Sequence, residues 1–205
     1  MKRYECLTAI APMVTNEIVL TTAGATSFEW QAHGPAGGHL QVKTLGLGSS
    51  IGLGLALMLP KRKVIVLDGD GALLMNLCSL PTLARNRPSN LIHIVFDNRV
   101  YEASGGTVTH TSAGADLAGI AKAAGIENVH TVDTVEDFVA RFQQAMQGNV
   151  LTFIRARVQT GFEMVPALQV DEVENKYRLI RFIEKTEGKS ILSADMPAGW
   201  STNQT

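Results

Sequence analysis

The alternation of short apolar runs with segments of helical periodicity constrains this fold more than any other feature. The apolar runs are rich in β-branched residues and lie at 17–22, 63–68, 90–96, 129–132 and 150–158. Apolar residues recur at helical spacing in the segments 4–14, 46–59, 73–84, 117–124 and 134–146. Apolar strands joined by helical crossovers are typical of a parallel sheet covered on both faces. The sequence therefore predicts an α/β fold: a doubly wound, mostly parallel sheet with helices on both faces.

The remaining stretches predict loops and a C-terminal extension. Residues 33–42 are rich in Gly and Pro, and residues 99–112 are polar, so we expect both to be loops. We expect residues 1–165 to form one domain and residues 166–205 a helical extension and tail. Within the extension, residues 170–187 are charged and amphipathic, and the polar tail from Ser190 is expected to be disordered or to face a partner.

Composition excludes several functional classes. The chain has 205 residues, 45% of them hydrophobic and 18% charged, which is sufficient for a sizeable core. The net charge is -1 and no Lys/Arg run is longer than residues 61–63, so we expect no nucleic-acid partner. No apolar stretch is long enough to predict a membrane span. Cys6 and Cys78 have neither zinc-site nor disulfide-framework spacing, which favours a cytoplasmic location.

Polar residues at two strand ends predict a metal site. Gly69, Asp70 and Gly71 follow one apolar run, where glycines let backbone N–H groups approach an anion. An aspartate in an anion site is explained if it binds a metal that bridges protein and phosphate. Asn98 follows 28 positions later, the length of one helix, a loop and a strand, so it should emerge beside Asp70. The alternative is that both residues only cap backbone groups.

Three further glycines approach a dinucleotide-binding pattern without matching its context. Gly46, Gly48 and Gly52 have nearly the required spacing, but the segment before them is a predicted loop instead of a strand. A nicotinamide-dependent dehydrogenase is therefore disfavoured. We expect these glycines to allow close packing of a helix on the sheet.

Taken together, these motifs resemble the signature of thiamine diphosphate-dependent enzymes. The run Gly69-Asp70-Gly71, followed by Val95-Phe96-Asp97-Asn98, resembles the cofactor signature of that family. Residues 45–57 and 101–107 resemble the flanking segments of sulfopyruvate and phosphonopyruvate decarboxylases, in particular the short beta subunit of the former, which carries only the diphosphate-binding domain. The resemblance spans roughly residues 1–160.

The resemblance implies a role for each matching position. Asp70, the Asn98 side chain and the Val100 carbonyl would ligate Mg²⁺. Leu45 would wedge between the two rings of thiamine diphosphate, and the Lys43 carbonyl would accept its exocyclic amine. The remaining cofactor-binding positions are Gly24, Ala25, Thr26, Ser27, Gly69, Gly71, Ala72 and Tyr101.

The resemblance also implies a partner and a reaction. The glutamate that activates the cofactor in this family lies on a separate pyrimidine-binding domain, so we expect it from a second subunit and expect the isolated chain to be inert. The expected reaction is decarboxylation of a small acidic 2-oxo acid such as 3-sulfopyruvate or phosphonopyruvate. Candidates for a basic substrate clamp are Lys43, Arg99 and His110. The substrate wall departs from the family at 43–45 and 103–105, which leaves the identity of the acid open.

Two other functions stay open at this point. One is carbon–carbon lyase or ligase chemistry of the acetolactate synthase kind, which uses the same cofactor. The other is a non-catalytic, cofactor-binding regulatory subunit.

Two residues elsewhere in the chain are expected to belong to the core. His93 lies within an apolar run and is expected to be a core histidine, and Cys78 is expected to pack in the core.

Overall fold

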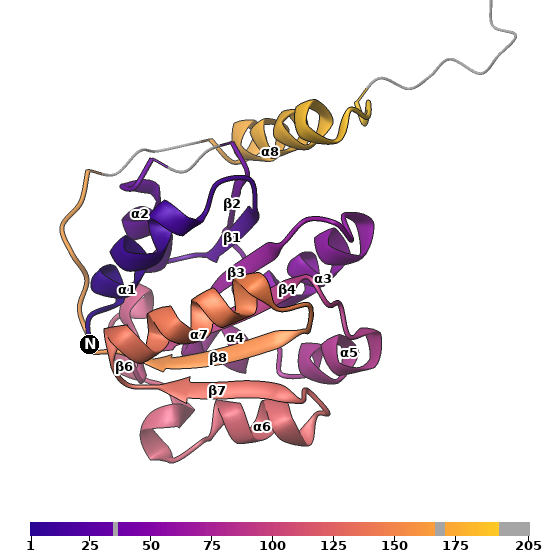
Figure 1. The fold of residues 1–205 in the computed structure, drawn as a ribbon. Helices are drawn as coiled ribbons and strands as arrows, with labels where there is room; N and C mark the ends of the chain where they lie inside the picture. The colour runs from indigo at the N-terminus through magenta and orange to yellow at the C-terminus, as the bar shows by residue number, and fades with distance from the viewer. Residues whose placement is uncertain (35–36, 167–170, 193–205) are drawn as a thin grey trace, which may run out of the picture.

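A six-stranded sheet forms the centre of the computed structural model, which describes residues 1–34, 37–166 and 171–192 (Figure 1). The strands run in the order β2-β1-β3-β4-β8-β7, and every pairing between them is parallel. Their bounds are β1 Ile18–Thr22, β2 His39–Val42, β3 Val64–Gly69, β4 Leu91–Asp97, β7 Asn128–Val132 and β8 Thr152–Arg157. The predicted α/β class and parallel sheet are confirmed.

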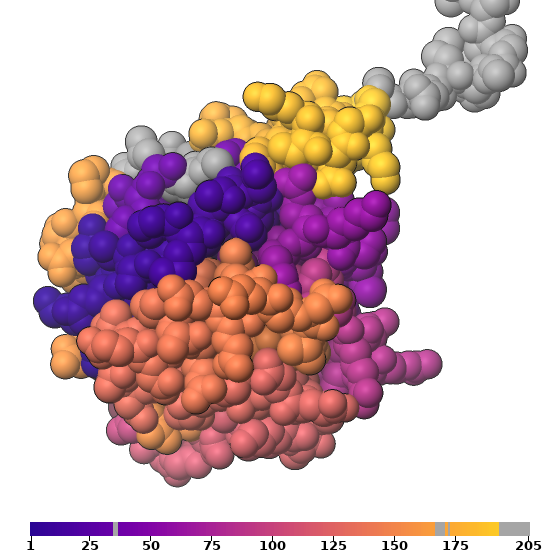
Figure 2. All heavy atoms as spheres, viewed as in Figure 1, coloured from indigo at the N-terminus to yellow at the C-terminus, as the bar shows by residue number. Residues whose placement is uncertain are grey.

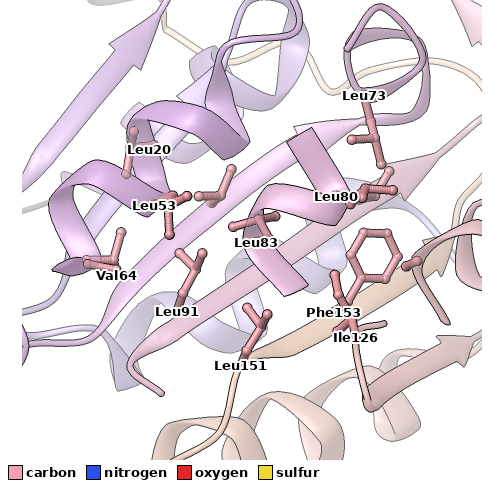
Figure 3. Packing of buried hydrophobic residues seen from close by; sticks show 14 of the residues in the cluster. Leu20, Leu53, Val64, Leu73, Leu80, Leu83, Leu91, Ile126, Leu151 and Phe153 are labelled. Atoms are coloured by element: carbon pink, nitrogen blue, oxygen red, sulfur yellow. The ribbon is translucent and has the colours of Figure 1, made fainter. Parts of the chain in front are cut away.

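Helices cover both faces of this sheet because its central strands are apolar on both sides. Along β3, Val64 and Val66 face one core cluster while Ile65 and Leu67 face the other. The first cluster contains residues of α3, α4, α5 and α6 and is shown from close by in Figure 3. The second contains residues of α1, α2 and α7. The bounds are α1 Arg3–Ile10, α2 Ala25–Gln31, α3 Gly48–Met58, α4 Asp70–Leu74, α5 Ser79–Asn86, α6 Leu117–Ala123 and α7 Val135–Gln147.

The structure corrects the expectation of a loop at 33–42. Residues 39–42 of that stretch form β2, an edge strand paired with β1 alone. His39 lies in this strand, where its Nε2 is 2.9 Å from Thr21 Oγ1 and burial lowers its pKa to about 4. The imidazole is therefore neutral at pH 7. A further helix, α2, follows β1 after Ala23 and Gly24, and no segment of helical spacing in the sequence predicts it.

Two other expectations also differ from the structure. The helical spacing at 73–84 spans two helices, α4 and α5, separated by residues 75–78. The polar stretch at 99–112 contains a small hairpin instead of a continuous loop. Its strands are β5 (Val100–Tyr101) and β6 (Thr107–Val108), and the 3-10 turns η2 (Glu102–Ser104) and η3 (His110–Ala113) follow them in turn.

Helix α8 (Glu172–Glu187) packs along β2 and covers that edge of the sheet (Figures 1 and 2). Leu179 and Ile183 join the first core cluster, and the Asn175 side chain donates to the Gln41 carbonyl at 3.0 Å. Within the expected extension 166–205, residues 167–170 and 193–205, including most of the polar tail, lie outside the described residues. The described helices include none with the length and apolarity required to cross a membrane.

Candidate functional site

A cleft opens at the carboxyl ends of β1, β3 and β4. Its lining comes from residues 22–26 at and beyond the end of β1, 69–72 at and beyond the end of β3, and 96, 98 and 100–104 at and beyond the end of β4. Leu45 and Arg3 also belong to the lining. The direction in which successive strands are added to the sheet changes between β1 and β3, because β2 lies on one side of β1 and the later strands lie on the other. Such a switch point is where ligands bind in open α/β sheets.

Asp70 is a buried carboxylate in the lining of this cleft. It begins α4 directly after β3, and 2% of the residue is exposed. Its Oδ2 accepts a hydrogen bond from Thr109 Oγ1 at 2.5 Å and one from Thr111 Oγ1 at 3.1 Å. Burial raises the pKa of Asp70, although these hydrogen bonds oppose that shift. A neighbouring cation would favour the ionised carboxylate.

Asn98 lies beside Asp70, as the spacing predicts. Gly69 pairs with Phe96 in the β3–β4 ladder, so the residues that follow these strands emerge at the same edge. The Asn98 Oδ1 accepts a hydrogen bond from the Val100 N–H at 3.1 Å. Arg99, between these two residues, has a left-handed backbone conformation with φ of 66°. Asn98 and Val100 both line the cleft, while Arg99 is exposed. The turn thus brings an amide oxygen and a main-chain segment to the cleft that contains Asp70.

Leu45 reaches the cleft from the loop before α3. The following residue, Gly46, has φ of 84°, a conformation that favours glycine. The Asn76 side chain fixes this loop by donating from Nδ2 to the Gly46 carbonyl at 2.7 Å. A residue from the α4–α5 connection therefore positions Leu45.

Most of the predicted cofactor-binding residues line the cleft, but two do not. Gly24, Ala25, Thr26, Leu45, Gly69, Asp70, Gly71, Ala72, Asn98, Val100 and Tyr101 belong to the lining. Ser27 is buried within α2, where its Oγ is 3.4 Å from the Gln31 amide nitrogen. Lys43 is exposed outside the lining, as are the other clamp candidates, Arg99 and His110.

Arg3 is a basic residue of the lining that the sequence analysis missed. Its Nε lies 2.7 Å from Glu29 Oε2 and its Nη1 lies 3.4 Å from Glu102 Oε2, with both Arg3 and Glu29 almost fully buried. Glu29 of α2 and Glu102 of η2 are therefore both paired with Arg3. A lone arginine near the N-terminus gives no spacing signal that would reveal this.

His93 and Cys78 differ in outcome. His93 is a core histidine, as expected: it is fully buried, its Nε2 lies 3.2 Å from Asp68 Oδ2, and its ring makes an edge-to-face contact with the Phe153 ring. Cys78 is exposed, so its expected core packing is wrong. It precedes α5, in the interruption between the two helices, where its thiol contacts the Asn76 side chain at 2.9 Å.

Comparison with known proteins agrees with this geometry. Residues 27–156 match the family described as thiamine pyrophosphate enzyme, C-terminal TPP binding domain. The chain is 34% identical to the sulfopyruvate decarboxylase subunit beta of Methanocaldococcus jannaschii over 90% of this chain and 98% of that protein. It is 35% identical to the phosphonopyruvate decarboxylase of Streptomyces hygroscopicus over 78% of this chain and 40% of that protein.

The solved structures show the same fold. A thiamine diphosphate-dependent 4-hydroxybenzoylformate decarboxylase from Rhodococcus jostii superposes with a TM-score of 0.64 at 22% identity, over 80% of this chain and 33% of that one. The match to the family model and the similarity to the M. jannaschii protein over nearly its whole length lead to one assignment, and the shared fold agrees with it. This chain belongs to the thiamine pyrophosphate enzyme family and carries its C-terminal, TPP-binding domain.

Proposed function

We propose that this chain is the diphosphate-binding subunit of a heteromeric thiamine diphosphate-dependent decarboxylase of small acidic 2-oxo acids, such as 3-sulfopyruvate or phosphonopyruvate. One observation carries the proposal. Asp70 and Asn98 meet in one cleft at adjacent strand ends, in a chain whose full-length relative is named sulfopyruvate decarboxylase subunit beta. Carboxylate, amide and carbonyl oxygens are the ligands that Mg²⁺ prefers.

The residues in the cleft fit the cofactor. Asp70, Asn98 and the Val100 carbonyl would hold Mg²⁺, and the backbone of Gly71 and Ala72 would hold the diphosphate. Gly69 leaves room for it, because a Cβ added at Gly69 would meet no protein atom within 4 Å. When bound, thiamine diphosphate supplies the electron sink for loss of CO₂ from a 2-oxo acid. The chain's own residues would bind and orient it, with Leu45 as the proposed wedge between its rings.

Gly69→Ala should weaken cofactor binding without weakening the fold. The φ of Gly69 is -110°, which alanine adopts readily, and the open space beside it adjoins the cleft that Gly69 lines. We expect the methyl group to obstruct the diphosphate and to lower thiamine diphosphate affinity by about tenfold or more, since polar contacts at van der Waals distance tolerate no added atom. Isothermal calorimetry with Mg²⁺ present measures this affinity.

Gly54→Ala is the matched control for that variant. Gly54 lies in α3 outside the cleft lining, and a Cβ there also meets no protein atom within 4 Å. It should leave the affinity unchanged. Equal affinities for Gly69→Ala, Gly54→Ala and the unaltered chain would show that the cofactor does not occupy the space beside Gly69.

The partner subunit would supply the activating glutamate. Among the described residues, the carboxylates that line the cleft are Asp70 and Glu102, and Glu102 is engaged by Arg3. Large apolar side chains are exposed within a few residues of the lining. They include Phe28 at 40%, Leu47 at 41%, Met75 at 57% and Val108 at 70% exposure. Exposed apolar side chains around a site are typical of a surface that another protein covers.

The function is tested by assay of the assembled complex. The chain is co-expressed with a pyrimidine-domain subunit, and purified complex is incubated with Mg²⁺, thiamine diphosphate and 3-sulfopyruvate, phosphonopyruvate or pyruvate in parallel. We expect release of CO₂ and an aldehyde in equal amounts from one of the two acidic substrates, and no turnover by either subunit alone. A hydroxyketone product would indicate ligase chemistry instead, and turnover unaffected by Asp70→Ala would indicate a regulatory subunit.

A further inference from the structure

A chain of buried polar side chains extends from Asp70 in the cleft to β8, the strand that pairs with β4 on the side away from β3. Its members are Asp70, Thr109, Thr111, Asp97 and Arg155, each exposing 6% or less of its surface. Asp97 ends β4, Arg155 lies in β8, and the two threonines flank the start of η3. No described residue of β8 lines the cleft. We call this set the buried polar chain.

The contacts within the buried polar chain are continuous. Thr111 Oγ1 lies 3.1 Å from Asp70 Oδ2 and 2.7 Å from Asp97 Oδ1, so one hydroxyl contacts both carboxylates. Thr109 Oγ1 adds the contact of 2.5 Å to Asp70 Oδ2 and lies 2.8 Å from Thr111 Oγ1. Arg155 approaches Asp97 Oδ2 with Nε at 2.7 Å and Nη2 at 2.6 Å.

Arg155 supplies the counter-charge for Asp97. Asp97 and Asp70 are two buried carboxylates joined through a single hydroxyl group, and a buried carboxylate without a counter-charge is strongly unfavourable. Arg155 neutralises Asp97 and fixes its Oδ2, which leaves Oδ1 toward Thr111. Arg155 is itself held by Asp116, whose Oδ1 lies 3.0 Å from Nη1. Each group therefore restricts the orientation of the next, and the last one restricted is the Asp70 carboxylate.

We propose that Arg155, Asp97 and the two threonines, Thr109 and Thr111, are positioning residues that fix the Asp70 carboxylate for a divalent cation. This inference rests on the proposed function, because it takes Asp70 to be a ligand of the cofactor's metal. Partners that orient a ligating carboxylate affect metal affinity without touching the metal. A residue of β8 would thereby influence a cleft to which β8 contributes no described side chain.

Thr111→Val tests the proposal, because it keeps the shape of the side chain and removes the hydroxyl. The complex with its partner subunit is held at saturating thiamine diphosphate, and Mn²⁺ is titrated as the probe by electron paramagnetic resonance. We expect Mn²⁺ to bind about 10–100-fold more weakly to Thr111→Val. Thr111→Ser restores the hydroxyl and should restore the affinity, which a purely structural role would not predict.

Thr152→Val is the matched control. Thr152 is a buried threonine of β8 whose hydroxyl contacts Asn128 and the Val150 carbonyl, outside the buried polar chain. Its Mn²⁺ affinity should equal that of the unaltered complex. If Thr111→Val does not fold, Thr109→Val provides the second test, since Thr109 contacts the same Asp70 oxygen.

Asp70→Asn separates failure of this inference from failure of the proposed function. Loss of Mn²⁺ binding in Asp70→Asn, with unchanged affinity in Thr111→Val or its substitute Thr109→Val, would overturn the positioning role alone. Retention of Mn²⁺ binding in Asp70→Asn would overturn both, because Asp70 would then not be a ligand. Selective weakening in Thr111→Val or Thr109→Val, with Thr152→Val unchanged, supports the proposal.

Discussion

Asp70→Asn is expected to abolish the magnesium-linked uptake of thiamine diphosphate while raising the thermal stability of the metal-free chain. The substitution removes the anionic ligand of the proposed metal. Changing a residue that only orients a metal ligand lowers metal affinity by about 10–100-fold, so loss of the ligand itself should lower cofactor affinity by more than about 100-fold. The stability gain follows from burial, which raises the pKa of Asp70 in the metal-free protein. A neutral amide of the same shape avoids the cost of burying the charge.

This stability gain should depend on pH in a defined direction. Burial raises the pKa of Asp70 in the folded state above its value in the unfolded state. The protonated carboxyl therefore stabilises the folded chain at low pH, and this stabilisation is lost as the pH rises through the folded-state pKa. The difference in melting temperature between Asp70→Asn and the unaltered chain should therefore be small below about pH 4, near the unfolded value, and should grow above it. Saturating Mg²⁺ and cofactor should reverse the order at neutral pH, since they bind only the unaltered chain.

Asp133→Asn provides the control for Asp70→Asn. Asp133 is an exposed carboxylate outside the cleft lining, whose partner is Arg157 at 3.5 Å. It should change neither cofactor uptake nor its magnesium dependence. Magnesium-linked uptake that survives in Asp70→Asn would contradict the proposed metal site.

The centre of the fold could be predicted from sequence because its signals are local. Strands such as β3 and β4 are continuous apolar runs that end in turn residues, and parallel connection places their ends at one edge. The approach of Asp70 and Asn98 follows from that rule alone. Gly69 and Gly71 follow from turn chemistry in the same way. The other lining positions, such as Leu45 and the residues after β1, were predicted from the resemblance to thiamine diphosphate-dependent enzymes.

The features that sequence reasoning missed depend on residues far apart in the chain. Strand β2 lies in a Gly-rich stretch, and helix α8 supports it: Asn175 donates to the Gln41 carbonyl, 134 positions away. The Phe182 ring of α8 packs so close to Gly38 that a Cβ added at Gly38 would lie 2.9 Å from Phe182 Cε1. The pairs Arg3–Glu29 and Arg155–Asp97 likewise join separate elements. The single available signal was Arg155 within an apolar run, since a buried arginine requires a partner.

Gly48 and Gly52, two of the three glycines that approach a dinucleotide-binding pattern, have the expected role of packing a helix on the sheet, whereas Gly46 lies in the loop before α3. A Cβ at Gly48 would lie 2.7 Å from Thr22 Cγ2, and one at Gly52 would lie 2.4 Å from Val66 Cγ2. Both distances are shorter than van der Waals contact. Helix α3 therefore lies against β1 and β3 at a distance that excludes larger side chains, and this contact fixes the loop that carries Leu45 relative to Asp70.

Gly52→Ala should destabilise the protein, whereas Gly54→Ala in the same helix should stabilise it. Val66 is fully buried in β3 and cannot yield to a new methyl group, so overpacking at Gly52 should cost about 1–3 kcal/mol in the free energy of unfolding. Gly54 is exposed and its added Cβ meets no protein atom within 4 Å, so alanine there should contribute about 0.5–1 kcal/mol through helix propensity. Urea denaturation of the two variants measures the difference. Equal midpoints would mean that α3 does not lie this close to the sheet, and that the glycine spacing requires another explanation.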